Sequence, residues 1–176
     1  MMHFTKILLL ASTAAAIILP RDATTVENDI NQRIGPQWTT LRNNINGYPE
    51  SGLQGAFNIH DGVQSLVAIT DDATADIKAA GSFSKADGTT ILTDLESLAP
   101  TFLGALSAIG NQAHTWANLQ GGQAVILSDL HSLNSSFIGF VNALTAASPA
   151  DLVPAATSVG AQVADGFNNA IAAYSG

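Results

Sequence analysis

The stretch that decides the fold is QAVILSDLHSLNSSFIGFVNALTAA, residues 123–147. Its large apolar side chains recur every three or four residues, which is the spacing of one face of an α-helix. They cover nearly half of the helix circumference, which is wider than the stripe of an ordinary surface helix. These side chains are Ile126, Leu127, Leu130, Leu133, Phe137, Ile138, Phe140, Val141 and Leu144.

Helical spacing recurs in four other stretches, and alternating strand patterns are absent. Residues 25–45, 53–80 and 85–109 each carry an apolar stripe, and a fifth helix is expected from Ser148 onward. Residues 111–122 are expected to form a loop with one helical turn. Short connections make successive helices antiparallel. The sequence therefore predicts an all-α fold, a single antiparallel bundle of about five amphipathic helices.

Capping and breaking residues mark the expected ends and kinks of these helices. Gly35-Pro36 and Pro100 lie inside two of the patterns and predict kinks there. Pro154 offers the last helix a second start, one turn after the first. The cap signals are Thr24 with Glu27, Ser84 with Asp87, and Ser148 followed by Pro149 and Asp151. On helix 53–80, the acidic side chains expected on the solvated back are Asp61, Asp72 and Asp76.

The N-terminal residues have the pattern of a secretory signal peptide. Lys6 precedes an apolar run, Ile7–Ile18, and Ala14–Ala16 supply the small residues of a cleavage site. The run stops at Pro20, whereas a membrane-spanning helix needs roughly 20 apolar residues. We therefore expect a leader at 1–19 and a secreted domain at 20–176, with no transmembrane segment and no lipid anchor.

Composition excludes several classes of function. Six basic residues against fourteen acidic ones give a net charge of -8, so no clustered cations are available for nucleic acid. The absence of Cys excludes disulfides, thiolate metal sites and thiol nucleophiles. No nucleophile, zinc or nucleotide-binding motif occurs. We expect no catalytic residue, no metal and no cofactor, because neither the three histidines after the leader nor Asp71, Asp72 and Asp76 form a convergent set.

Asn134 is unusual because it falls at the centre of an apolar helix face. A buried amide without partners costs roughly 1–3 kcal/mol, so an interhelical hydrogen bond is one interpretation. A polar contact to the head group of a ligand is the second. The third is glycosylation, since Asn134-Ser135-Ser136 is the only N-x-S/T sequon, although a glycan needs an exposed side chain.

The two helices at 85–109 and 123–147 have apolar faces too wide for one neighbour. Either they occupy the middle of the bundle, or their surplus surface lines a cavity or binds an apolar partner. Glycines inside the helices, which let backbones approach closely, are also compatible with a soft or hollow bundle. They are Gly104, Gly139, Gly160 and Gly166.

Three stretches carry a resemblance to a known family. They are ILTDL at 91–95 continuing to LAPT at 98–101, SPADL at 148–152, and GFNNAIAAY at 166–174. Together with the leader, the absence of Cys and the five helices, they resemble the fungal hydrophobic surface binding protein A and cell wall galactomannoprotein Mp1 family. The resemblance covers essentially the whole mature chain.

The resemblance implies a secreted or wall-associated helical bundle without enzymatic activity. Some relatives bind long-chain fatty acids or other lipids between helices. Others adsorb to hydrophobic surfaces and recruit secreted hydrolases such as cutinase, which is the alternative function. The missing Ser/Thr-rich extension and anchor signal favour a free form. The residues predicted from the inward stripes to line an apolar site are Leu98, Phe102, Leu106, Leu130, Phe137, Val141, Val163 and Phe167, with Asn134 as the polar contact.

Overall fold

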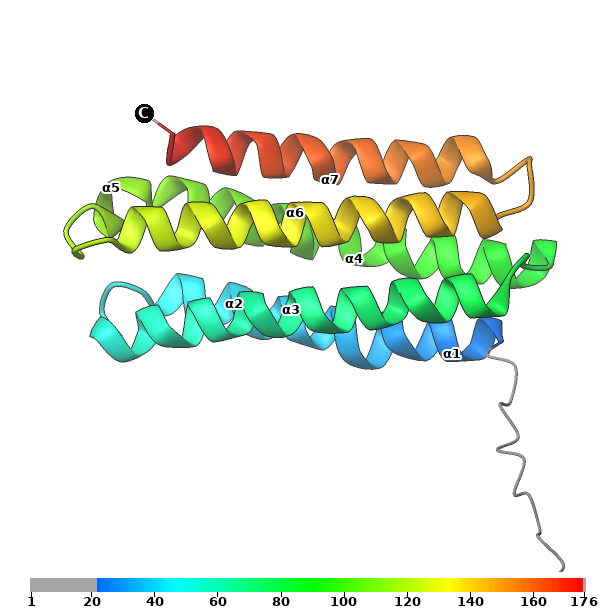
Figure 1. Cartoon of the computed structure of the whole chain (residues 1–176), viewed down its shortest axis with the longest axis horizontal. Coiled ribbons are helices and arrows are strands. Elements are labelled where there is room, and N and C mark those ends of the chain that lie inside the picture. Colours follow the sequence, from blue (N-terminus) through cyan, green and yellow to red (C-terminus); the bar gives the residue numbers. More distant parts are fainter. Residues whose placement is uncertain (1–21, 176) are drawn as a thin grey trace, which may run out of the picture.

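The computed structural model describes residues 22–175, and its described part is built from helices without strands (Figure 1). The predicted leader at 1–19 lies outside the described residues. The all-α prediction is confirmed. The elements are α1 (Ala23–Asn28), η1 (Asp29–Ile34), α2 (Gly35–Gly47), α3 (Gly52–Ala80), α4 (Lys85–Asn111), the short α5 (Ala113–Trp116), α6 (Gly122–Ala147) and α7 (Val153–Ala173).

Elements α1, η1 and α2 form one continuous rod, although a kink or break was expected at Gly35-Pro36. Pro36 has no N–H, and its ring would clash with the carbonyl oxygen four residues earlier in a regular helix. The preceding turns are π-helical, and the Gly35 N–H donates to the Ile30 carbonyl, five residues back. The wider turn accommodates the proline, so the rod continues without a break.

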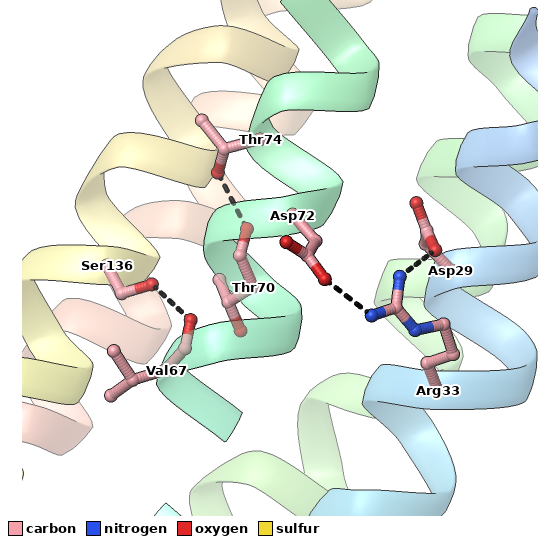
Figure 2. Close-up of polar contacts among 7 residues, drawn as sticks. All are labelled: Asp29, Arg33, Val67, Thr70, Asp72, Thr74 and Ser136. Carbon is pink, nitrogen blue, oxygen red and sulfur yellow. Dashed lines mark hydrogen bonds and ion pairs between the residues drawn. The ribbon is translucent and has the colours of Figure 1, made fainter. Parts of the chain in front are cut away.

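Arg33 fastens this rod to α3. Its guanidinium donates to the buried Asp29 carboxylate on its own rod, at 2.7 Å, and to Asp72 of α3, at 2.8 Å (Figure 2). Both hydrogen bonds raise the pKa of Arg33, with the bond to Asp72 contributing most. The side chain therefore links two helices through a charge-assisted pair on each side.

The first helix start differs from the sequence prediction, the last helix uses the second start predicted at Pro154, and the start of α4 agrees with its predicted cap. The first helix is capped by Asp22, whose carboxylate accepts from the Thr25 N–H at 3.0 Å, rather than by Thr24. The last helix starts at Val153 with Pro154 in its first turn, because the residues before it form a turn. Ser84 caps α4, as predicted, by accepting from the Asp87 N–H.

The five long rods form a closed ring in the order α2, α3, α6, α7 and α4, with α4 returning to α2. In Figure 1, α7 lies at the top, α6 lies in front of α4, and α3 lies in front of the first rod. Successive rods alternate in direction, as predicted. The spatial neighbours differ from the chain order, however, because α4 packs between α2 and α7 rather than beside α3.

Three seams of the ring, α3–α6, α4–α7 and α2–α4, join parallel helices. Along the α2–α4 seam, Gly35 contacts Leu98 and, further along both helices, Gly104 contacts Arg42. Along the α3–α6 seam, His60 contacts Asp129 and, further along both chains, Val67 contacts Ser136. The α4–α7 seam also runs parallel, since the start of α4 meets the start of α7 and the ends of the two helices meet as well. Parallel neighbours arise because each pair is separated in sequence by another rod.

The α3–α6 seam contains acidic and hydroxyl side chains that the stripes did not predict. Asp129 is 3% exposed and accepts hydrogen bonds from Gln64. Ser136 donates to the Val67 carbonyl oxygen at 3.3 Å (Figure 2). It also donates to Asp71 at 2.5 Å. Asp76, which was expected on the solvated back of α3, is 5% exposed, so that expectation is wrong for this residue. Asp61 and Asp72 are exposed as expected.

Helix α6 is long and apolar enough to cross a membrane by length and composition. This differs from the expectation of no transmembrane segment. Hydrogen bonds to α3 and a buried apolar face nevertheless pack α6 into the bundle.

Candidate functional site

The eight residues predicted to line an apolar site lie on three of the five rods, α4, α6 and α7. Six of them are buried and face the interior of the ring. Leu98 and Val141 are half-buried and pack against glycines of neighbouring helices, Gly35 and Gly160. The structure therefore brings the predicted residues onto the inner side of the bundle and its seams.

Aromatic rings occupy the centre of the ring of helices. The centroid of Phe137 lies 6.2 Å from that of Phe102 and 6.0 Å from that of Phe167. Trp38 of α2 belongs to the apolar stripe of residues 25–45 and was not among the predicted site residues. Its ring lies 5.0 Å from that of Phe102 and 6.4 Å from that of Phe167. The signal that could have found it is that Trp38 is the one aromatic residue of its stripe.

A ring of five helices has a wider centre than a four-helix bundle. With interaxial distances of about 9 Å, each axis lies about 8 Å from the centre of a five-membered ring and about 6 Å from that of a four-membered one. Side chains must fill the additional space to reach the packing density of a protein interior. The four rings of Trp38, Phe102, Phe137 and Phe167 do so here.

A cleft runs along the α4–α7 seam, outside this aromatic centre. It has a volume of about 370 Å³, and Leu106 contributes to its wall from the predicted set. Gly166 and Gly110 allow α7 and α4 to approach closely on either side. Asp165 and Asn169 give the mouth of the cleft a polar edge.

Asn134 lies on the α6–α7 seam. It shares a line along α6 with Leu127 and Val141, which are seven residues away on either side, and Val141 packs against Gly160 of α7. Its Oδ1 is buried and has no hydrogen-bond partner within residues 22–175. The interhelical hydrogen bond is therefore absent for this oxygen in the described chain. Contact with a head group and glycosylation both stay predictions.

Exposed apolar side chains gather at the end of the bundle where α3 and α6 begin. Leu53 and Phe57 of α3 expose 57% and 54% of their surface, and Val125 of α6 exposes 42%. With Trp116 and Leu119 they line a cleft of about 350 Å³. We call these five residues the end patch. Exposed apolar side chains gathered in this way make the end patch a candidate interaction surface.

Titratable side chains form structural pairs rather than a reactive cluster. His60 Nδ1 lies 2.8 Å from the buried Asp129, whereas His114 and His131 are exposed. No group of three or more His, Cys, Asp or Glu side chains in residues 22–175 could hold a metal ion. Burial raises the pKa of Tyr174, whose hydroxyl donates to the Ile109 carbonyl oxygen at 2.7 Å.

The family model of hydrophobic surface binding protein A matches residues 23–146. The chain belongs to this family. The match covers the first four long rods and stops before α7. The resemblance inferred from the three short stretches is thereby confirmed, whereas the cell-wall galactomannoprotein assignment stays a prediction.

Solved structures show that the fold of the whole bundle, including α7, is shared with known proteins. AfMp4p, solved in complex with palmitic acid, is 29% identical with a TM-score of 0.81, over 88% of this chain and 100% of AfMp4p. Two ligand-binding domains of the Penicillium marneffei MP1 protein were solved with arachidonic acids. Domain 1 has a TM-score of 0.79 over 87% of this chain and 99% of its own. Domain 2 has a TM-score of 0.78 over 89% and 97%.

Both MP1 domains are 14% identical to this chain, so they support the fold alone. Curated protein sequences gave no match.

Proposed function

We propose that this hydrophobic surface binding protein A family member is a secreted, non-enzymatic protein that binds a long-chain fatty acid or a similar lipid. The ligand lies in the interior of the helical ring. The observation that carries the proposal is the aromatic centre formed by Trp38, Phe102, Phe137 and Phe167. AfMp4p, which has the same fold and was solved with palmitic acid, supports it.

The acyl chain enters by displacing the side chains that fill the wide centre of the ring. Burial of a methylene contributes about 0.8 kcal/mol, so a palmitoyl chain contributes about 10 kcal/mol. Association costs about 4–15 kcal/mol in lost freedom, and each displaced ring adds about 1 kcal/mol. Because gain and cost are similar, contacts to the head group decide the affinity. Asn134, with its unpartnered Oδ1, is the predicted polar contact.

Native mass spectrometry of the delipidated protein tests this function. We expect one fatty acid to bind per chain, with an affinity that rises with chain length from twelve carbons until the interior is full. Methyl-β-cyclodextrin, which removes free fatty acid, serves as the control for adventitious adsorption. The absence of any adduct across this range would contradict the proposal.

Adsorption to hydrophobic surfaces is a second function, favoured by the end patch. Leu53 and Phe57 are more than half exposed, so replacing both by serine leaves the core intact. We expect this double variant to adsorb less to polystyrene beads than the parent protein. Ile138→Ser is the matched control, because Ile138 is 46% exposed on α6 but lies outside the end patch. Equal losses in both variants would show that the end patch has no special role.

Recruitment of a secreted hydrolase such as cutinase follows from the same alternative. The protein adsorbed through the end patch would present its acidic remaining surface to the enzyme. Co-sedimentation of cutinase with protein-coated and bare beads measures this recruitment, and equal binding to both would contradict it.

A further inference from the structure

Four cations lie in the described part of the chain, and they differ in the acidic side chains around them. Arg33 pairs with two aspartates, and Lys85 pairs with Asp151 at 2.5 Å. Lys78 makes no ion pair with residues 22–175, but it lines a groove together with Asp71. Arg42 makes no hydrogen bond or ion pair with residues 22–175.

The surroundings of Arg42 contain no carboxylate in either packed helix. Residues 38–46 of its own helix hold no acidic side chain, and residues 100–108 of α4, across the seam, hold none either. This is notable in a chain with fourteen acidic residues and a net charge of -8. An anion approaching the α2–α4 seam at this level would therefore meet a cation without adjacent competitors.

The guanidinium of Arg42 rests on the backbone of α4 at Gly104. A Cβ at Gly104 would lie 3.2 Å from Arg42 Cζ and 3.3 Å from Nε. Glycine inside a helix costs about 1 kcal/mol relative to alanine, and this close approach explains its presence. The absence of a side chain thus holds a planar cation flat against the seam.

The same seam reaches the aromatic centre on its inner side. Trp38 lies one turn before Arg42 on α2, and Phe102 lies two residues before Gly104 on α4. The rings of Trp38 and Phe102 are 5.0 Å apart at the interior. A single seam therefore carries buried aromatic rings inside and an unpaired guanidinium outside, which is the polarity of a fatty acid.

We propose that Arg42 anchors the carboxylate of the acyl ligand at the outer mouth of the α2–α4 seam. This inference rests on the proposed function and names the head group that the site selects. A guanidinium binds a carboxylate through two parallel hydrogen bonds, which an alcohol of the same chain length cannot form. The protein should therefore prefer a fatty acid to the corresponding fatty alcohol.

The anchor is tested by comparing the affinities of the delipidated full chain for palmitate and for 1-hexadecanol. Native mass spectrometry and Trp fluorescence measure both affinities. Arg42→Gln should weaken palmitate about tenfold and leave hexadecanol within twofold. Gly104→Ala should have a smaller effect in the same direction, because the added methyl displaces the guanidinium while favouring the helix. Lys78→Gln is the matched control, since it removes the same charge elsewhere and should leave palmitate within twofold.

The outcomes separate the anchor from the function on which it rests. Selective loss of palmitate in Arg42→Gln supports the anchor. Equal losses in Arg42→Gln and Lys78→Gln, or an unchanged preference for palmitate in Arg42→Gln, would overturn it while fatty acid binding stands. If the parent protein bound neither ligand, the proposed function would fail together with the anchor. Asn134→Leu distinguishes Asn134 from Arg42 as the polar contact. If the amide contacts the head group, this substitution should lower the affinities for both palmitate and hexadecanol, whereas Arg42→Gln should lower only the affinity for palmitate.

Discussion

Phe137→Ala provides the sharpest test of an interior site. Phe137 is 6% exposed, and its ring contacts those of Phe102, Phe140 and Phe167 at centroid distances of 6.0–6.2 Å. Removing a buried phenyl group costs about 3–5 kcal/mol, because the neighbours close the resulting cavity only in part. A domain of this size is stable by about 5–15 kcal/mol, so the variant should remain folded.

The expected fall in melting temperature depends on the number of residues in the domain. A loss of about 4 kcal/mol lowers the melting temperature by about 10 °C in a domain of this length. An acyl chain that enters the vacated volume restores packing which the variant has lost. Palmitate should therefore raise the melting temperature of Phe137→Ala by more than it raises that of the parent protein.

Differential scanning calorimetry with and without saturating palmitate measures both quantities. Ile126→Ala is the matched control, because Ile126 is fully buried on the same helix but lies about 16 Å from Phe137 along its axis. This control should lose stability without gaining ligand response. An identical palmitate-induced shift in both variants would refute the reasoning, since the ligand would then be insensitive to the centre of the ring.

Three further substitutions test the packing and charge arguments. Tyr174→Phe loses its hydrogen bond to Ile109 and about 1 kcal/mol at neutral pH. The pKa of Tyr174 is raised in the folded state, so the unfolded state loses its proton first as pH rises above 10, the ordinary value for tyrosine. The parent protein should therefore lose stability above pH 10, and the variant should lose less. Urea melts that show the same pH dependence for both proteins would contradict this. Gly160→Ala should destabilise by about 1–2 kcal/mol in urea melts, since its Cβ would lie 2.6 Å from Val141, and a neutral result would show that α7 can shift. Asp129→Asn should cost about 2 kcal/mol by removing a buried charged acceptor, and an unchanged melting temperature would contradict its structural role.

The existence of the helices could be predicted from the sequence because each buries one stripe. Ser84 was a correct cap because its hydroxyl is followed by Asp87 at the required distance. The prediction of Thr24 as a cap was wrong, because the carboxylate of Asp22, two residues upstream, accepts a hydrogen bond from the Thr25 N–H at the helix start. Local signals thus identified elements, whereas competition between adjacent caps decided their ends.

The buried acids could not be predicted from their own helices. Asp129 has no partner within a turn of α6, and its hydrogen-bond donors His60 and Gln64 are 65 to 69 residues away on α3. A carboxylate is expected to be exposed unless a partner satisfies it, and only the pairing of α3 with α6 supplies that partner. The site depends on the same information, because Trp38 joins the aromatic centre only when α2 packs against α4.

The wide apolar faces of α4 and α6 find their explanation in the ring. One expectation was that these two helices occupy the middle of the bundle, and it is wrong. Each helix instead packs against two neighbours in the ring and also faces the interior. A helix that meets two neighbours across an open centre needs apolar residues over nearly half of its circumference, which is the width observed in residues 123–147. The same geometry creates the space that aromatic rings now fill. The surplus apolar surface in the sequence and the wide centre in which we propose that an acyl chain binds therefore have one cause, a ring of five rods instead of four.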